Sequence, residues 1–392
     1  MSSDLPTKVD VAILGGGLAG LWLAHSLADH ANVLLVDQPS GHQACSSSSL
    51  GIAAAGQGDN PARLAAGLGA DASEALWRWS RRATDRLRGL CKELDVGLTL
   101  GPVVRLAFDK HEDAELRTTA ALLRRWEPDN EVRVIEREEI RSGGLGGQFS
   151  FGLHLSRDFI CPVVRVTDGL RDRLDGRAAR VLGTATTSGP SQGAVAVHVE
   201  GQTTYAEIVV VCGGAGSAAI HPAFTDLVIP VRVHASAIHK ALSVADSGDL
   251  QQGAALTRHR FESWTWGPEK SLNFAGCRWA EGPDMGAGNR DTTALNERVV
   301  GAHRAFIQQH LGLGQTAEGP LQSRSGITAY SCDGIPLVGP LLGAPRVLAM
   351  TAWGGWGLSA IGAAVEDLTF AILDRQGAPA APRALLGPRR ML

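Results

Sequence analysis

Few features of this sequence point to nucleic acid, a membrane or a disulfide framework. The formal net charge is only −3, so the chain lacks the basic excess of a protein that binds nucleic acid or an anionic membrane. Residues 1–8 are polar without the shape of a signal peptide, and every apolar run is too short to span a bilayer. The six cysteines are scattered without a C-x-x-C pair. We therefore expect reduced thiols, a cytoplasmic location and no nucleic-acid partner.

The composition is that of an ordinary globular protein. Hydrophobic residues make up 44% of the 392 residues and charged residues 20%. This length exceeds what one simple core needs, and it predicts two domains.

The most informative stretch runs from Val9 to Asp37. An apolar run is followed by Gly15, Gly17 and Gly20 in the spacing G-x-G-x-x-G, then by a helical pattern and a second apolar run that ends at Asp37. Glycine allows the tight turn, lets a pyrophosphate approach the backbone, and lets helix and strand pack closely. The free N–H groups at the helix start favour an anion. The stretch predicts an adenine dinucleotide site and leaves open whether NAD or FAD binds.

The C-terminal region favours a flavin. A strand over residues 346–351 precedes the turn AWGGWG and an apolar helix predicted over 358–373. A helix start at this point suits the negative charge of a reduced flavin ring, which a simple NAD-dehydrogenase does not need. A third apolar strand, 208–211, ends in Cys212-Gly213-Gly214, as expected beside a bound dinucleotide.

Between these regions the patterns predict further elements without a chemical motif. Amphipathic helices are expected over 71–94 and 112–126, a strand over 98–108, a hairpin over 194–211 and a helix within 291–310. The serine run 46–49 is interpreted as a tight loop that offers hydroxyl and amide groups to a ligand. A flexible linker is the alternative.

Taken in order, these segments resemble the D-amino-acid oxidase and glycine oxidase superfamily of FAD enzymes. The likeness lies in VDVAILGGGLAGLWLAHSLAD, NVLLVD, SSSSLGIAAAG, EIVVVCGGAGS and MTAWGGWGLSAIGAA. The family pattern G-x-x-x-x-[TS]-x-D-G-x-P-x-[IV]-G also fits in register, at Gly326, Ser331, Asp333, Gly334, Pro336, Val338 and Gly339.

The resemblance implies non-covalent FAD, because no cysteine lies near Gly326, where sarcosine-oxidase relatives attach their flavin. It implies no metal. The cofactor-binding residues that it implies are Gly15, Gly17, Leu18, Ala19, Gly20, Asp37, Gln38, Ser46, Ser47, Gly51, Ile52, Val181, Cys212, Gly213, Gly214, Gly354, Gly355, Trp356, Gly357 and Leu358.

The expected fold class is α/β, a Rossmann-like FAD-binding domain with a doubly wound βαβ arrangement and a central parallel sheet. A second, α+β substrate domain with a mostly antiparallel sheet completes it. We assign residues 1–75, 150–220 and 320–392 to the FAD-binding domain, which is discontinuous, and residues 76–149 and 221–319 to the substrate-binding domain.

One departure from the family concerns the substrate. Amino-acid-oxidising members place an arginine two residues after the glycine equivalent to Gly326, and this chain has Thr328 there. Threonine cannot replace the bidentate carboxylate anchor. A plain amino-acid substrate then requires another arginine to reach the site, and the candidates are Arg258, Arg260, Arg278 and Arg324. For each of these, a surface or ion-paired position is the favoured interpretation.

Three residues are the candidates for contact with the reacting groups: Thr328, Tyr330 and Trp353. Trp264 and Trp266 would either complete an aromatic pocket for a bulky substrate or pack in the core. Any substrate-holding role of His234, His239 or His259 competes with a structural one.

The predicted function is oxidation of a C–N bond in an amine or amino-acid-like substrate by hydride transfer to flavin N5. Reoxidation by O2 would give H2O2, although another electron acceptor and an oligomeric state stay open. One alternative is a 2-hydroxyacid dehydrogenase or tailoring oxidase of the same superfamily. Another is an FAD monooxygenase or halogenase, but Cys332-Asp333-Gly334 does not match the G-D-A-x-H/P loop typical of that class.

Overall fold

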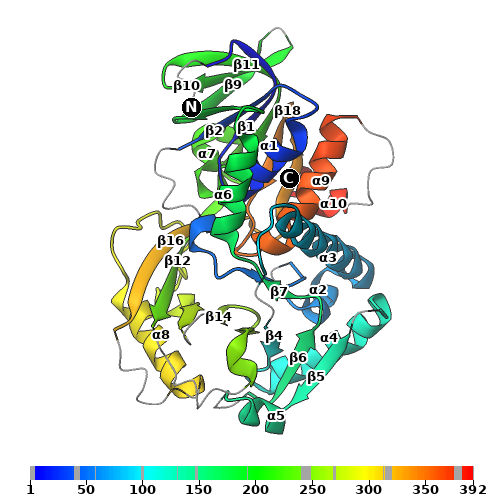
Figure 1. Ribbon diagram of the computed structural model, residues 1–392, viewed down its shortest axis with the longest axis vertical. Helices are drawn as coiled ribbons and strands as arrows, with labels where there is room; N and C mark the ends of the chain where they lie inside the picture. The colour runs from blue at the N-terminus through cyan, green and yellow to red at the C-terminus, as the bar shows by residue number, and fades with distance from the viewer. Residues whose placement is uncertain are drawn as a thin grey trace.

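The computed structural model describes residues 5–38, 45–57, 59–98, 101–129, 131–145, 149–191, 193–239, 249–267, 271–311, 313, 320–374 and 382–391. Its two lobes each contain an eight-stranded sheet, and long strands and helix α3 lie where the lobes meet (Figure 1). This is the expected α/β class with a nucleotide-binding lobe and a second, mostly antiparallel lobe.

The first sheet has the order β17-β18-β11-β1-β2-β8, and β9 and β10 extend it from β11. Strands β1, β2, β8, β11 and β18 run parallel because crossovers connect them, whereas β17 is an antiparallel edge. The bounds are β1 Lys8–Leu14, β2 Val33–Asp37, β8 Ala179–Leu182, β9 Ala185–Ser191, β10 Ala194–Val199, β11 Gln202–Val211, β17 Leu337–Leu341 and β18 Ala344–Thr351.

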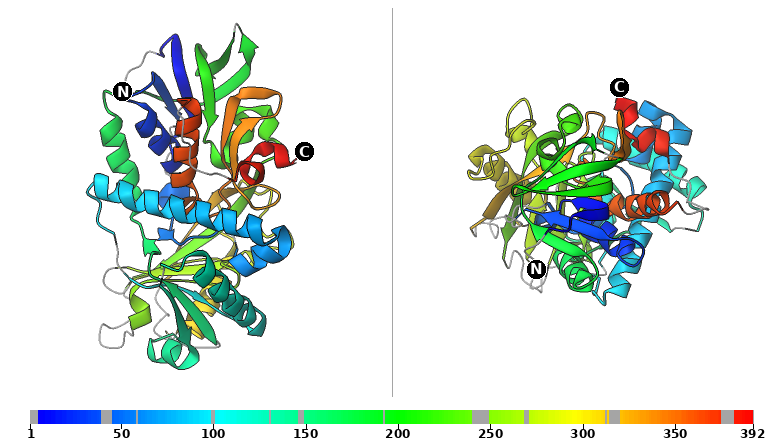
Figure 2. Two further views of the ribbon diagram at one scale, coloured as in Figure 1. Left: turned by 90° about the vertical axis from the view of Figure 1, so that its right-hand side faces the viewer. Right: turned by 90° about the horizontal axis from the view of Figure 1, so that it is seen from above.

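Alternate residues of β1 point to opposite faces, and both faces are buried, as in parallel sheets generally. Val11 and Ile13 pack with helices α1 (Leu18–Leu27), α3 (Ala70–Glu93), α6 (Val163–Leu174) and α9 (Ile361–Ile372). Ala12 and Leu14 pack on the other side, with the β9–β10 hairpin and short helix α7 (Ser217–Ile220) nearby. Figure 2 shows α9 and the C-terminal α10 (Arg383–Leu386) close to this sheet.

The second sheet has the order β16-β12-β15-β14-β13-β4-β6-β5, and only its β13–β4 pair is parallel. Helices α5 (Arg137–Ser142) and α8 (Glu297–His310) contribute to its main core, while α4 (Lys110–Trp126) packs near β6. The strands are β4 Val103–Leu106, β5 Val132–Glu136, β6 Phe151–Leu155, β12 Ile229–Ile238, β13 Ala254–Thr257, β14 Glu262–Trp266, β15 Leu272–Ala275 and β16 Gln322–Tyr330.

The packing crosses the domain boundaries drawn from the sequence. Residues of α3 beyond position 76, such as Trp79 and Leu87, are buried in the core of the first lobe. Conversely, β6 and β16 belong to the second sheet, although the division assigned 150–220 and 320–392 to the FAD-binding domain. These exchanges arise because the chain passes between the lobes more often than the sequence division assumed.

The lobes are joined by a two-stranded ladder and by buried charges. Strands β3 (Ile52–Ala53) and β7 (Phe159–Ile160) pair antiparallel, while α2 (Pro61–Leu68) packs on α3 and α4. Immediately before β7, the fully buried Asp158 accepts bonds from Arg105 of β4 (2.7 Å) and Arg81 of α3 (3.1 Å). One carboxylate therefore connects the second sheet to a helix of the first lobe.

One local expectation needs correction, and one alternative left open by the sequence is decided. The final helix begins at Ile361 rather than near residue 358, because Ala360 leaves helical backbone angles and residues 357–359 form a separate 3-10 turn. Trp264 and Trp266 are buried in the core of the second lobe and line no substrate pocket. In the described part of the chain, no helix has the length and apolar character needed to cross a membrane.

Candidate active site

A long cavity of about 780 Å³ joins the two lobes. At one end it is lined by the glycine turn after β1, the end of β2 and the turn after β11; at the other end it reaches β12, β15 and β16. We call these the dinucleotide end and the substrate end. The parallel strands β1, β2 and β11 all finish at the dinucleotide end, which is where open α/β sheets bind ligands.

Glycine at two positions determines the shape of the dinucleotide end. Gly15 has φ +123°, and a Cβ there would lie 2.6 Å from the carbonyl oxygen of Cys212. A Cβ at Gly20 would overlap the carbonyl oxygen of Gly15, so α1 packs on β1 only with glycine there. Gly17 instead faces open space, with Ser46 Oγ 3.5 Å from the point that a Cβ would occupy. The turn therefore packs tightly against the sheet and leaves room on its cavity side, as a bound pyrophosphate requires.

Backbone amides at this end are held by side chains from two other segments. Asp37 Oδ1 accepts hydrogen bonds from the amides of Gly16 (3.0 Å) and Gln38 (2.9 Å). The amide of Leu18, at the start of α1, donates to Ser46 Oγ (3.1 Å). The first turn of α1 itself contains no acidic residue. These features fit a dinucleotide.

The C-terminal turn closes the middle of the cavity. Trp353, Gly354, Gly355, Trp356, Gly357 and Leu358 all line it. Ser359 Oγ donates to the carbonyl of Gly56 (3.0 Å), and Gln57 Nε2 donates to the carbonyl of Ser359 (2.5 Å). Segments three hundred residues apart are therefore tied into one wall.

Most of the sequence-predicted cofactor residues line this cavity, and four do not. Among the described residues, the lining includes Gly15, Gly17, Leu18, Ala19, Asp37, Gln38, Ser46, Ile52, Cys212, Gly213 and Gly214 as well as the C-terminal turn. Gly20, Ser47, Gly51 and Val181 lie outside it. Val181 sits on edge strand β8, beside a separate small pocket, while Gly183 and Ala185 reach the cavity instead.

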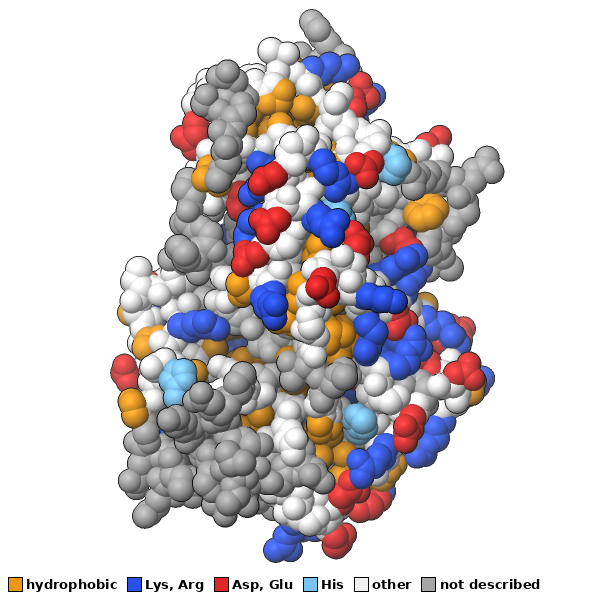
Figure 3. Space-filling model, viewed as in Figure 1, with side chains coloured by type: hydrophobic (Ala, Val, Ile, Leu, Met, Phe, Trp, Pro, Cys, Tyr) orange, Lys and Arg blue, Asp and Glu red, His pale blue; other side chains and the backbone are white. Residues whose placement is uncertain are grey.

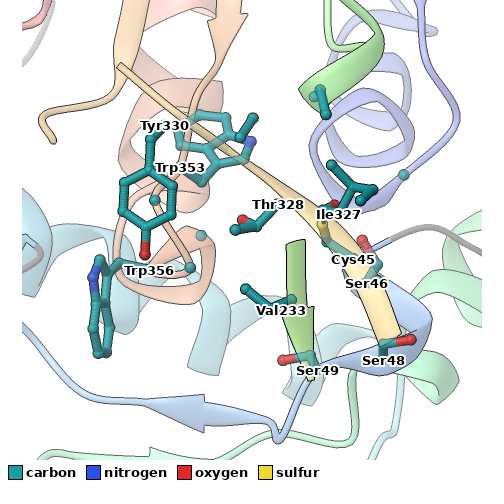
Figure 4. Close-up of a pocket in the computed structure, with 18 of the residues that line it drawn as sticks. Cys45, Ser46, Ser48, Ser49, Val233, Ile327, Thr328, Tyr330, Trp353 and Trp356 are labelled. Atoms are coloured by element: carbon teal, nitrogen blue, oxygen red, sulfur yellow. Dashed lines mark hydrogen bonds between the residues drawn. The ribbon is translucent and has the colours of Figure 1, made fainter. Parts of the chain in front are cut away.

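At the substrate end, β16 places Thr328 and Tyr330 side by side (Figure 4). They are two residues apart on one strand and so face the same side. The hydroxyl of Tyr330 points toward the C-terminal turn and accepts a hydrogen bond from Arg278 Nη1 (2.8 Å). Burial raises the pKa of Tyr330, and the Arg278 guanidinium opposes this shift.

Three of the four candidate arginines line the cavity. Arg278 follows β15, and its Nε is buried without a hydrogen-bond partner. Arg260, between β13 and β14, is 4% exposed and lies over the Trp356 ring, 3.9 Å from its centroid. Arg324 also lines the cavity and donates to the carbonyl of Ser48 (3.3 Å). Arg258 instead pairs with Glu262 (3.4 Å).

The candidate histidines have structural partners. The amide of Asn296 donates to His234 Nε2 (3.1 Å), and His239 bonds Gln322 (3.2 Å). His259 lines the cavity and pairs with Glu115 (3.4 Å), which raises the pKa of the imidazole while burial opposes the shift. Gln57 and Phe261 also line the cavity. The sequence did not predict them because neither lies in a motif.

The same architecture occurs in solved structures. Glycine oxidase from Geobacillus kaustophilus matches with a TM-score of 0.78 and 16% identity, over 98% of this chain and 99% of that one. L-proline dehydrogenase from P. horikoshii matches with a TM-score of 0.77 and 14% identity, over 99% and 98%. Iminodiacetate oxidase from Chelativorans sp. BNC1 matches with a TM-score of 0.71 and 18% identity, over 96% and 98%. At these identities the likeness shows the fold alone.

No curated protein matched the sequence. The profile of the DAO family, described as FAD dependent oxidoreductase, matches residues 10–369, which is nearly the whole chain. Together with the glycine turn, the C-terminal turn and the long cavity between them, this match settles the cofactor as FAD and the class as oxidoreductase. The chain belongs to the DAO family of FAD-dependent oxidoreductases.

Proposed function

We propose that this enzyme oxidises the C–N bond of an amino-acid-like substrate, and that Arg278 and Tyr330 hold the substrate carboxylate. The observation that carries the proposal is the hydrogen bond from Arg278 to Tyr330 beside Thr328. Thr328 occupies the strand position where amino-acid-oxidising relatives have arginine, and Arg278 brings a guanidinium to the neighbouring residue of that strand. The positive charge is present, and it comes from the 3-10 turn that follows β15.

Three properties of Arg278 support this role. No described carboxylate lies within 4.0 Å of its guanidinium, so its charge is not used in an ion pair. It stacks against Tyr330 (5.0 Å) and Phe261 (5.5 Å), which fixes the plane of the guanidinium. A planar fork held in this way suits a carboxylate, which it binds through two parallel hydrogen bonds.

The FAD of this family supplies a hydride acceptor, flavin N5. The chain's own residues bind and orient the substrate: Arg278 and Tyr330 hold one end, and Trp353 and Trp356 wall the cavity and exclude water. Removal of two electrons and two protons converts an amine to an imine. With O2 as the proposed electron acceptor, those electrons and protons appear as H2O2.

The names of the similar structures agree with this substrate class. Glycine oxidase, L-proline dehydrogenase and iminodiacetate oxidase are each named for an amino or imino acid. From these names we propose only the class of substrate for this enzyme, and no individual compound. The alternative of a flavin monooxygenase has no supporting observation in the described cavity.

The test mixes the FAD-loaded protein with a panel of amino acids and of matching amines that lack the carboxylate. Without oxygen, we expect an amino acid to bleach the flavin; under air, we expect H2O2 in equal amount to the imine. Bleaching by NADPH alone would refute the proposal in favour of a monooxygenase.

Arg278→Gln sharpens this test. Removing one partner of a buried charged contact costs about 2–5 kcal/mol, so kcat/KM for amino acids should fall at least 30-fold. The loss should be much smaller for the carboxylate-free amines. Arg324→Gln is the matched control, because that guanidinium also lines the cavity but is exposed and bonds only a loop carbonyl. Equal losses for both variants would argue against Arg278 as the anchor.

A further inference from the structure

A second guanidinium, that of Arg260, lies in the same cavity with unused hydrogen-bonding capacity. Its Nη2 donates to the carbonyl of Ala54 (3.1 Å) and its Nη1 to that of Ala55 (3.5 Å). Arginine has five N–H donors, so three remain, and the buried Nε has no partner. A buried cation without an anion is unfavourable, which makes this group different from an ordinary surface arginine.

The nearby acids are already committed elsewhere. Asp158 is paired with Arg81 and Arg105, and Asp59 pairs with Arg63 (2.9 Å). No described carboxylate lies within ion-pair distance of Arg260. Burial and the neighbouring Arg105 lower the pKa of Arg260 to about 9, so the group still carries its charge at neutral pH. Asp59, which also lines the cavity, and Asp158 act on Arg260 only at longer range, so its guanidinium has no direct anionic partner among the described residues.

The backbone that presents Arg260 is strained and specifically supported. Arg258, His259 and Arg260 have φ values of 50°, 54° and 69°, three consecutive non-glycine residues in the left-handed region. The buried carboxylate of Glu112 holds the turn by accepting bonds from the amides of Arg258 (3.1 Å) and His259 (2.7 Å). Backbone strain of this kind persists where surrounding structure enforces it, and it is concentrated at ligand sites.

The two guanidinium groups are neighbours along the C-terminal turn. Tyr330 Oη, the partner of Arg278, lies 3.8 Å from the position that a Cβ on Gly355 would take. Arg260 stacks on the next residue, Trp356. Phe261, which follows Arg260 in sequence, contacts Arg278 with its ring. A small molecule bound at Arg278 can thus extend toward Arg260 within one cavity.

We propose that the substrate carries a second acidic group, bound by Arg260, so that the enzyme acts on a dicarboxylic amino or imino acid. This inference rests on the function proposed above, in which Arg278 and Tyr330 hold the first carboxylate. The competing role of Arg260 is purely structural: it would only orient the carbonyls of Ala54 and Ala55. The two roles differ in what they predict for ligands that carry one or two carboxylates.

The experiment titrates the FAD-loaded protein with non-oxidisable acids and follows the flavin absorbance. Succinate and glutarate are compared with butyrate and valerate, which match them in chain length. We expect the dicarboxylates to bind at least tenfold more tightly. Arg260→Gln should remove this preference while changing monocarboxylate binding less than twofold, and Arg260→Lys should restore part of the preference. Arg258→Gln removes a charge from the same turn and should leave both affinities unchanged.

The outcomes separate this inference from the function on which it rests. If monocarboxylates and dicarboxylates bind the wild-type protein equally, the second acidic group is refuted, whether or not Arg260→Gln folds. The second acidic group is equally refuted if Arg260→Gln weakens both ligand classes alike. In either case, flavin bleaching by monocarboxylic amino acids would leave the proposed C–N oxidation standing. Failure of every amino acid, acidic ones included, to bleach the flavin would overturn both proposals.

Discussion

The dinucleotide end of the cavity is built mainly from backbone, and the substrate end mainly from side chains. At the first end, glycine turns and the amides of Gly16 and Leu18 form the wall, and Asp37 and Ser46 hold those amides. At the second end, Arg278, Arg260 and Tyr330 project from separate strands and turns. A cofactor shared by a whole family can be bound by backbone geometry, whereas substrate selection depends on a few side chains that can be exchanged.

The two ends also differ in their surroundings. Helices cover the sheet at the dinucleotide end, and acidic and basic side chains alternate across the outer face near α6 (Figure 3). Away from the dinucleotide end, the buried Asp158 connects the second sheet to helix α3 of the first lobe. We call the Asp158 contact between the lobes the joint. Substitutions at the joint, at the dinucleotide end and in the strained turn 258–260 test this contrast separately.

The largest effect is expected at the joint. Asp158→Asn would leave the buried guanidinium groups of Arg81 and Arg105 without their shared carboxylate, at a cost of about 3–5 kcal/mol in the free energy of unfolding. Denaturant titration of the FAD-loaded protein measures this. Asp85→Asn is the control, because Asp85 forms a half-exposed ion pair with Arg157. We expect this variant to lose less than about 1 kcal/mol in the free energy of unfolding.

The same carboxylate predicts a dependence on pH. Burial alone would raise the pKa of Asp158, but Arg105 and Arg81 outweigh it and lower the pKa. The stabilisation is therefore complete above the unfolded-state value of about 3.9 and is lost as pH falls through the lower folded-state value. If Asp158→Asn matched the wild type at neutral pH, the carboxylate would not be what holds the lobes together.

A smaller effect, confined to the cofactor, is expected at Gly15. Alanine there would be forced into φ +123° with its Cβ against the Cys212 carbonyl, a strain of about 1–3 kcal/mol. FAD affinity should fall roughly 10- to 100-fold, measured by the quenching of flavin fluorescence on addition to apoprotein. Once saturated with FAD, the variant should bind substrate like the wild type. Gly67→Ala, in open space on α2, should leave FAD affinity unchanged.

The dinucleotide end could be predicted from the sequence, whereas most of the substrate end could not. The β1 turn, Asp37 and the strand ending at Cys212 are local patterns, in which each residue's role follows from its neighbours in the chain, and the structure brings them together. The roles of Arg260 and Arg278 depend on contacts between residues such as Arg278 and Tyr330, 52 positions apart. No period or motif encodes such a contact. The missing arginine at Thr328 was visible in the sequence, which offered four candidate arginines as replacements without distinguishing Arg278, the one we propose.

How the helices and strands of the two lobes pack could not be predicted from the sequence for a related reason. The apolar face of α3 predicted burial without identifying the surface that buries it, and the structure packs it against α9. The apolar composition of Trp264 and Trp266 equally suited a pocket or a core. Only the position of β14 within the second sheet distinguishes the two, and it places both rings in the core.

The smallest effect is expected at His259, in the strained turn of the substrate end. Glu115 raises the pKa of His259 above its usual value of about 6.5, so the ion pair stabilises the fold fully below that pH. The contribution is lost as pH rises through the folded-state pKa. We expect the wild type to lose up to about 1 kcal/mol of unfolding free energy between roughly pH 6 and 8. His259→Gln should flatten this slope, whereas His111→Gln, an exposed neighbour whose ring lies 6.2 Å away, should keep it. An unchanged slope in His259→Gln would mean that the turn is held by Glu112 alone, through the backbone.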